Sequence, residues 1–151
     1  MIRLIQNDLL CNAIRLLEIQ QRSYKIEAEI IGFKDLPPLF ETKDKLMADQ
    51  AKYLAYIENG LIVGFLAYEV DDQTLEIHKL VVDPDCFRKG IASKLLDYLI
   101  LEAHDINLMI VSTGADNNPA INLYKNKGFA VTHASIIEET LKIAHLKRIM
   151  D

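Results

Sequence analysis

The sequence is poor in cysteine, the residue that cross-links small secreted domains. Its 151 residues contain only Cys11 and Cys86, far apart and without the spacing of a metal site. Two isolated cysteines argue for free thiols in a reducing compartment, and we interpret both as small packed side chains. Since half of the chain is hydrophobic, a core can form without disulfides. We expect a single domain over residues 1–151.

Long apolar runs and net positive charge are also missing. No stretch approaches the roughly 20 apolar residues that a membrane-spanning helix needs, and the amino terminus lacks the pattern of a signal peptide. The formal net charge of −5 argues against a broad nucleic-acid surface. We therefore expect a cytoplasmic protein without membrane or nucleic-acid partners.

Several familiar catalytic and nucleotide-binding motifs are absent from the chain. Neither Gly-x-x-x-x-Gly-Lys-Ser/Thr nor Gly-x-Gly-x-x-Gly occurs, which argues against a nucleotide P-loop and a dinucleotide fold. The histidines and cysteines lack zinc-ligand spacing, so no metal is expected. No Gly-x-Ser-x-Gly or Cys–His arrangement indicates a covalent acyl-enzyme.

The hydrophobic pattern predicts an ordered series of helices and strands. The predicted elements are a strand near 2–5, a helix up to 31, a short helix from 42, three antiparallel strands between 52 and 82, a helix from 90, a strand at 107–113, a helix from 118 to 127, and strands near 129–138 and 141–149. The order β-α-α-β-β-β-α-β-α-β-β indicates a mixed α/β (α+β) domain. We expect one central, mostly antiparallel sheet of about seven strands, flanked by about four helices.

Turn and cap residues define the boundaries of these elements. Asn59-Gly60 is a strong hairpin signal, because a tight two-residue turn needs positive φ. Asp8 and Asn118 are predicted to cap the helices that follow them, and Gly32 is predicted to end the first long helix. The Pro37-Pro38 pair predicts extended chain before the second helix.

The stretch CFRKGIASKLL places Arg88, Lys89 and Gly90 between a strand and a helix. The first turn of a helix has unpaired N–H groups and partial positive charge, so a glycine-ended loop can admit an anion there. Asp83 and Asp85 would repel an anion, and we expect them to point away. Taken alone, the stretch favours an ordinary glycine turn into a surface helix.

Two motifs together are similar to the GCN5-related N-acetyltransferase (GNAT) superfamily. LVVDPDCFRKGIASKLL resembles its acetyl-CoA loop, Arg/Gln-x-x-Gly-x-Gly/Ala, and ADNNPAINLYKNKGF resembles Asn-x-x-Ala-x-x-Leu-Tyr-x-x-x-Gly-Phe. The predicted element order resembles that fold over essentially the whole chain. The resemblance implies acetyl-CoA as cosubstrate, two strands splayed to hold it, and transfer of the acetyl group to a primary amine of a small molecule or peptide by direct attack in a ternary complex.

The resemblance also implies a set of cofactor-binding positions. Loop amides would bind the pyrophosphate of coenzyme A, and backbone groups of the preceding strand would face pantetheine. The positions are Leu80, Val82, Arg88, Lys89, Gly90, Ile91, Ala92, Asn117 and Tyr124. Leu80 and Val82 equally fit plain core residues, and Asn117 equally fits a turn residue. Phe87 departs from the motif, since it stands where the family has Arg or Gln.

The catalytic candidates are Tyr124, His78 and Glu76. A phenol with a pKa near 10 can protonate a departing thiolate, whose thiol has a pKa of about 8.5, and the resemblance places a tyrosine with this role at Tyr124. Strand alternation puts Glu76 and His78 on one face with Leu80 and Val82, where an imidazole, glutamate or water could accept the amine proton. Alternatively, Tyr124 only packs on the sheet, and Glu76 and His78 form a solvated polar patch.

The acceptor is the least defined part of the prediction. The segment Tyr24–Phe40 is expected to select it, and the acids nearby, Glu27, Glu29, Asp35 and Glu41, would suit a cationic amine, although such acids often form a solvated helix face. The alternative to an enzyme is a non-catalytic acyl-CoA-binding or regulatory module, which would not need Tyr124. A generic interaction domain is the third possibility, and the sequence leaves a homodimer open.

Overall fold

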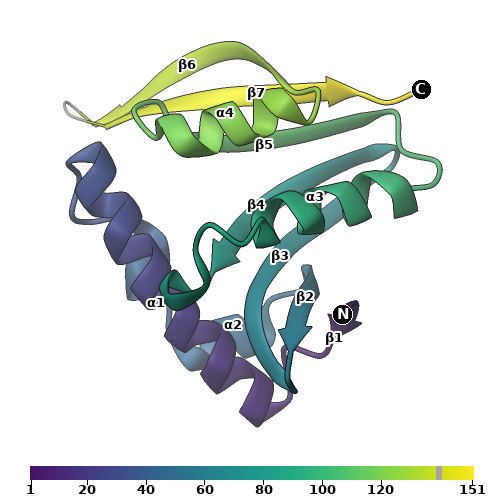
Figure 1. Ribbon diagram of the computed structural model, residues 1–151. Coiled ribbons are helices and arrows are strands. Elements are labelled where there is room, and N and C mark those ends of the chain that lie inside the picture. Colours follow the sequence, from purple (N-terminus) through teal and green to yellow (C-terminus); the bar gives the residue numbers. More distant parts are fainter. Residues whose placement is uncertain (139–140) are drawn as a thin grey trace.

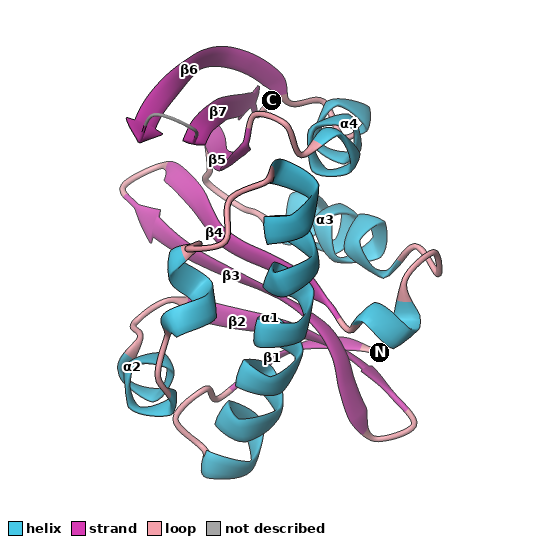
Figure 2. Ribbon diagram, turned by 90° about the vertical axis from the view of Figure 1, so that its left-hand side faces the viewer, coloured by secondary structure: helices cyan, strands magenta, loops and turns pink. Residues whose placement is uncertain are grey.

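The computed structural model describes residues 1–138 and 141–151, which form one seven-stranded sheet with helices on both faces (Figures 1 and 2). The strands are β1 (Ile2–Ile5), β2 (Lys52–Glu58), β3 (Leu61–Asp71), β4 (Thr74–Val82), β5 (Leu108–Gly114), β6 (Ala130–Glu138) and β7 (Leu141–Ile149). The helices are α1 (Leu10–Ile31), α2 (Lys43–Ala48), α3 (Ile91–Glu102) and α4 (Asn118–Asn126), with 3₁₀ turns η1 (Pro37–Phe40) and η2 (Pro84–Cys86). The predicted class and element order are confirmed.

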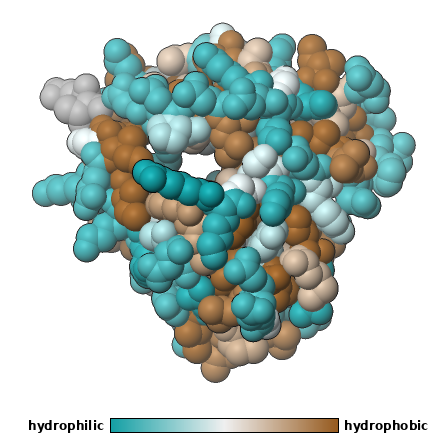
Figure 3. Space-filling model, viewed as in Figure 1, coloured by the Kyte–Doolittle hydropathy of each residue, from teal (hydrophilic) through white to brown (hydrophobic). Residues whose placement is uncertain are grey.

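The sheet splits in its middle. The strand order is β1-β2-β3-β4-β5-β7-β6, and the central pair, β4 and β5, is parallel. These two strands pair only over Thr74–Ile77 and Leu108–Val111, although β4 continues to Val82 and β5 to Gly114. Beyond the paired residues they diverge into a V (Figure 1), and Figure 3 shows an opening through the molecule between its two halves. The predicted splay is confirmed.

The sheet separates two clusters of buried side chains. One packs under α1 and α2 and includes Leu16, Leu46 and Phe65, whereas the other packs under α3 and α4 and includes Leu95 and Met109. The apolar stripe of each helix therefore faces the sheet, as helical spacing of hydrophobic residues predicts. The V runs between the carboxyl-terminal ends of β4 and β5, next to both clusters.

A β-bulge interrupts β4. Ala67 of β3 pairs with Lys79, and the next residue, Tyr68, pairs with Ile77. His78 is therefore an extra residue on β4 that no β3 residue faces. A bulge of this kind bends the strand and breaks the strict alternation of its side chains. It stands at the point where β4 and β5 part.

Because of the bulge, the predicted shared face of β4 is wrong. The sequence pattern placed four residues on one face, Glu76, His78, Leu80 and Val82. Leu80 and Val82 pack against the cluster under α3 and α4, as Ile77 does before the bulge. Glu76, which alternates with Ile77, lies on the opposite face, and its Oε1 is 3.3 Å from Nε2 of His78. The set is divided between the two faces of the sheet.

Several predicted boundaries are confirmed by backbone geometry. Asn59 and Gly60 form the hairpin turn with φ of 53° and 77°. Gly32 ends α1 in the left-handed conformation, and Thr42 caps α2 by accepting a hydrogen bond from the amide of Lys45.

Three local predictions are wrong. Pro37–Phe40 forms a 3₁₀ turn instead of extended chain, because the φ of proline also fits the first residues of such a turn. Asp8 does not cap α1, whose N-cap is Leu9 without a side-chain hydrogen bond. Helix α4 is capped by Asn117 instead of Asn118. In each case the residue type was suitable, and the chain around it decided which position is used.

Candidate functional site

The loop from β4 to α3 presents a row of free backbone amides beside the V. Within the described chain, no amide from Arg88 to Ser93 donates a hydrogen bond to protein, and the first helical bond of α3 runs from the amide of Lys94 to the carbonyl of Gly90 at 3.0 Å. Arg88 and Gly90 have φ of 68° and 74°. Left-handed residues of this kind can turn successive N–H groups toward one anion, and the dipole of α3 adds positive potential.

The space in front of these amides can hold a ligand. A Cβ added to Gly90 would meet no atom within 4 Å. Lys89, whose side chain is half exposed, lies 3.6 Å from the carboxylate of Glu58 and leaves the amides uncovered. Free amides, open space and flanking cations together fit a diphosphate group.

The two aspartates before the loop point toward α1, as expected. The carboxylate of Asp83 is 2.7 Å from Arg15 and 2.8 Å from Arg22, and Asp85 is 3.1 Å from Arg22. Burial would raise the pKa of Asp83, but the Asp85 amide and the two arginines outweigh it and lower that pKa. Both negative charges are thus neutralised away from the free amides.

Beyond Ile77, β4 has a strand partner on its β3 side alone. Its edge toward β5 therefore carries backbone groups that face the V. The side chains of Leu80 and Val82 are half buried against the cluster under α3 and α4, so their core role is confirmed. A role of their backbone groups in binding pantetheine stays a prediction.

Tyr124 lies on α4, the helix that follows β5, and packs in the cluster under α3 and α4. It is 4% exposed, and its ring packs edge-on against Phe129 with centroids 5.5 Å apart. Its hydroxyl makes no hydrogen bond within the described residues and is not among the atoms sealed from solvent. Burial first, and the Glu27 carboxylate second, raise the pKa of Tyr124, so the phenol keeps its proton at neutral pH.

A carboxylate from α1 reaches the same place. Oε1 of Glu27 accepts hydrogen bonds from Nδ2 of Asn117 at 2.7 Å and from Oγ1 of Thr113 at 3.4 Å. Burial raises the pKa of Glu27, and these two hydrogen bonds lower it only in part. The sequence indicated Glu27 merely as part of an acidic rim, because nothing in its spacing relates α1 to β5 and α4.

The side chain of Asn117 is engaged at both ends. Its Oδ1 accepts a hydrogen bond from the amide of Ala120 at 3.3 Å, and its Nδ2 donates to Glu27. The structure thus shows Asn117 as a helix cap that also holds a carboxylate. Its predicted contact with the cofactor stays a prediction.

Glu76 and His78 lie together at the parting of β4 and β5, with side chains that are 53% and 32% exposed. They are on the face covered by α1 and α2, whereas Tyr124 belongs to the cluster on the other face. The structure therefore brings the two β4 candidates next to each other and places Tyr124 across the sheet from them.

A buried charge network fastens the segment between α1 and α2 to β4. Lys79, 9% exposed, pairs with Glu41, and its Nζ lies 3.1 Å from the hydroxyl of Tyr53. Glu41 also accepts a hydrogen bond from Gln20 at 3.0 Å, and the Tyr53 hydroxyl donates to Asp49 at 2.8 Å. The sequence reasoning missed this network, although a lysine inside an apolar strand was the available signal.

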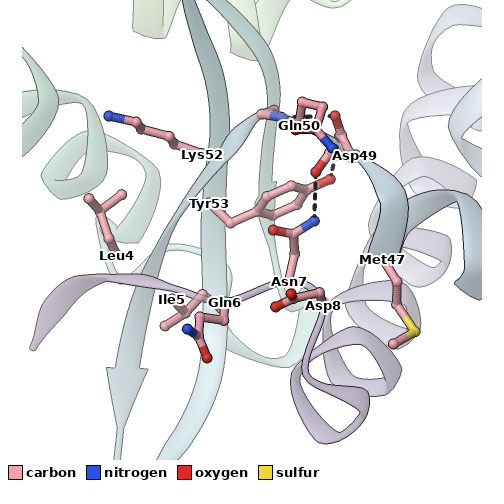
Figure 4. A pocket seen from close by; sticks show the side chains of 11 residues that line it. Leu4, Ile5, Gln6, Asn7, Asp8, Met47, Asp49, Gln50, Lys52 and Tyr53 are labelled. Atoms are coloured by element: carbon pink, nitrogen blue, oxygen red, sulfur yellow. Dashed lines mark hydrogen bonds between the residues drawn. The ribbon is translucent and has the colours of Figure 1, made fainter.

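Two hollows on the surface lie outside the V. One, of about 410 Å³, is bordered by β1, β2 and the end of α2, with Asn7, Asp49 and Tyr53 in its wall (Figure 4). The other, of about 770 Å³, lies beside the end of α1 and is lined by apolar residues such as Phe33 and Phe40 together with charged residues such as Lys25 and Glu29. The second borders the segment expected to select the acceptor. The described residues contain no cluster of metal-ligating side chains, and none of their helices is long and apolar enough to span a membrane.

The fold of the chain is shared with solved acetyltransferases. The ribosomal-protein-S18-alanine N-acetyltransferase of Escherichia coli superimposes with a TM-score of 0.80 at 17% identity, over 100% of this chain and 94% of that one. An N-acetyltransferase of Thermoplasma acidophilum, solved in complex with coenzyme A, gives a TM-score of 0.75 at 17% identity, over 99% of both chains. At such identities these likenesses show the fold alone.

Sequence comparison identifies the family. Residues 13–129 match the model of the acetyltransferase (GNAT) family, so the chain belongs to that family. A curated relative, the UPF0157 protein YqkA of Bacillus subtilis, is 37% identical over 129 residues, which are 85% of this chain and 38% of that protein. The chain thus spans well under half of that relative's length.

Proposed function

We propose that the protein is an acetyl-CoA-dependent N-acetyltransferase that acetylates a primary amine of a small molecule or peptide by direct attack in a ternary complex. The observation that carries this proposal is the row of free amides from Arg88 to Ser93 beside the parted strands. Family membership and the coenzyme A found in the Thermoplasma structure support it. When bound, acetyl-CoA supplies the acetyl group as an activated thioester.

On the donor side, this chain binds mainly with its backbone. The amides of Arg88, Lys89, Gly90, Ile91 and Ala92 hold the pyrophosphate, helped by the dipole of α3. Backbone groups of Leu80 and Val82 hold the pantetheine arm along the free edge of β4. Amides at the same edge also polarise the thioester carbonyl.

On the catalytic side, Tyr124 holds a proton for the departing thiolate. Its raised pKa keeps the phenol protonated, and its hydroxyl is left without a protein partner in the described residues. The β4 pair, Glu76 and His78, stands at the parting of the strands, where the pair or a water can take a proton from the amine. The acceptor amine enters from the side of the segment between α1 and α2.

The test is release of free thiol from acetyl-CoA across a panel of small amines and amino-terminal peptides. Tyr124→Phe is expected to lower turnover about 10²–10⁴-fold with coenzyme A affinity near wild type. Tyr98→Phe, the same change at an exposed tyrosine of α3, is the matched control. Full activity of Tyr124→Phe would remove Tyr124 from the mechanism, and coenzyme A binding without turnover on a broad panel would favour the non-catalytic alternative.

A further inference from the structure

A carboxylate of α1 occupies the V without a role in the chemistry described so far. We propose that Glu27, rather than Glu76 or His78 of β4, accepts the proton that the attacking amine loses. The inference rests on the acetyl transfer proposed above and assigns the base of that reaction. It is carried by the position, hydrogen bonds and unpaired charge of Glu27.

The position of Glu27 is fixed from two sides of the V. Its partners, Thr113 at the end of β5 and Asn117 at the start of α4, belong to one half of the sheet, whereas α1 packs on the other half. Ile31, one turn further along α1, is so close to Gly114 that a Cβ there would lie 3.0 Å from its side chain. The end of α1 therefore lies next to the end of β5.

One oxygen of Glu27 is available for a proton. Both of its hydrogen bonds fall on Oε1. Within the described residues Oε2 has no hydrogen-bond partner and is not sealed from solvent. Hydrogen bonds to one oxygen orient the carboxylate, and the other oxygen stays available to accept a proton, as a general base requires.

The charges around Glu27 leave its carboxylate uncompensated. No described lysine, arginine or histidine forms a salt bridge with it. The titratable groups that face it are the phenols of Tyr24 on its own helix and Tyr124 on α4, with the Glu41 carboxylate also close enough to raise the pKa of Tyr24. Thr113 and Asn117, its partners from β5 and α4, are neutral. Such surroundings make a carboxylate more basic.

The β4 pair is less suited to this role. Glu76 and His78 have side chains that are 53% and 32% exposed, contact each other, and lie across the sheet from Tyr124. Glu27 instead contributes directly to the raised pKa of Tyr124, which places both groups in one electrostatic environment. Pairs of groups that share a site in this way commonly divide the acid and base roles.

The proton then follows a closed path. Below the pKa of the amine the acceptor arrives as an ammonium ion, which first gives one proton to Oε2 of Glu27, and Glu27 releases that proton to water. The neutral nitrogen then forms a bond to the acetyl carbon with its lone pair, and the carbon–sulfur bond breaks with its electrons on sulfur. The amine proton passes to Oε2 of Glu27, and the Tyr124 hydroxyl gives its proton to sulfur. Glu27 returns the proton to the Tyr124 oxygen, so one N–H of the neutral amine is consumed, one S–H is formed, and both side chains are restored.

The test is the pH profile of kcat/KM for Glu27→Gln. Glutamine keeps an oxygen for Asn117 but cannot accept a proton. We expect a loss of about 10²–10⁴-fold at pH 6–7 that shrinks as the pH approaches the pKa of the amine, because the amine is then already neutral. Coenzyme A affinity and melting temperature should stay near wild type. Glu18→Gln, the same change at an exposed glutamate of α1, is the matched control and should keep the wild-type pH profile.

Other results would overturn the assignment. A Glu27→Gln enzyme with the wild-type profile, or one lowered equally at every pH with a raised KM for acetyl-CoA, would show no base or a positioning role only. If His78→Ala, and not Glu27→Gln, lowered kcat/KM selectively at low pH, the base would be assigned to His78 of β4. Wild-type protein that turns over no acceptor would instead overturn the proposed acetyl transfer itself, and the Glu27 role with it.

Discussion

The two loops beside the V are held in opposite ways. The donor loop, residues 83–92, is anchored at its start by Asp83 and leaves its following amides free. The acceptor segment, residues 33–42, is fastened through Glu41 to Lys79 and Gln20. In the proposed function the donor loop would bind with its backbone amides, whereas side chains hold the acceptor segment in place. The difference shows why the first has a local sequence motif and the second does not.

Among variants of the two loops, Gly90→Leu should have the largest effect, and it should act on the donor loop alone. A side chain at φ 74° costs about 1–2 kcal/mol and fills the space expected for phosphate. Coenzyme A affinity, measured by calorimetry, should fall at least about 100-fold, or roughly 2.7 kcal/mol. Gly60→Leu is the control, because Gly60 has φ 77° and equally open surroundings but lies in the β2–β3 turn. Equal loss in both variants would indicate general destabilisation.

Replacing Lys79 and Lys89 one at a time should distinguish the role of the acceptor segment from that of the donor loop. Lys79→Met leaves Glu41 with Gln20 and the Tyr53 hydroxyl with Asp49 as their remaining partners, and should lower the free energy of unfolding by about 1–3 kcal/mol while raising the KM of the acceptor. Lys89→Met breaks an exposed contact and should change stability by less than about 0.5 kcal/mol while weakening coenzyme A binding a few-fold. Denaturant unfolding and steady-state kinetics measure both. A Lys79→Met protein impaired mainly for coenzyme A would contradict this division.

Asp83→Asn should show how the donor loop is anchored. Since Arg15, Arg22 and the Asp85 amide hold the pKa of Asp83 below its usual 3.8, its ionised form stabilises the fold above that pH, and this stabilisation is lost as pH falls through the lowered pKa. The variant should be about 1–2 kcal/mol less stable at pH 7, with the difference shrinking below about pH 4. Asp85→Asn, at an exposed side chain, should change little. A constant difference at all pH values would contradict this origin.

Arg88→Gly should have the smallest effect. Arg88 has φ 68°, a conformation that glycine adopts without strain, so the variant should gain up to about 1 kcal/mol of stability. Coenzyme A affinity should fall only a few-fold, because the amide remains and one positive charge is lost. Arg88→Ala keeps the strain and separates the two contributions. If Arg88→Gly lost as much coenzyme A affinity as Gly90→Leu, the Arg88 side chain would take the role of the family's Arg or Gln, whose motif position is Phe87 in this chain.

Local patterns predicted most of the fold. Element order, the Asn59-Gly60 hairpin and the Gly32 helix end depend on neighbouring residues, and all three are confirmed. The bulge at His78 could not be predicted in this way. The bulge adds one residue to β4 relative to β3, and no residue type in this stretch indicates that a bulge will form. One extra residue was enough to put Glu76 and Leu80 on opposite faces.

For the candidate site too, features set by neighbouring residues could be predicted, whereas contacts between distant residues could not. The loop around Gly90 and the position of Tyr124 follow from two contiguous motifs. The contacts of Glu27 with Asn117, and of Lys79 with Glu41, join residues about 40 to 90 positions apart, so they depend on how the V is folded. The segment proposed to select the acceptor is held by distant contacts of this kind, and its details required the structure.

The most direct test of the account is the response of the loop amides to ligand. Amide chemical shifts of ¹⁵N-labelled protein are to be followed during titration with coenzyme A and, in parallel, with pantetheine, which lacks the pyrophosphate. If these amides bind the pyrophosphate, coenzyme A should shift the amides of residues 88–92 most strongly, whereas pantetheine should leave them unchanged. Loop amides unaffected by saturating coenzyme A, or shifted equally by pantetheine, would contradict the account.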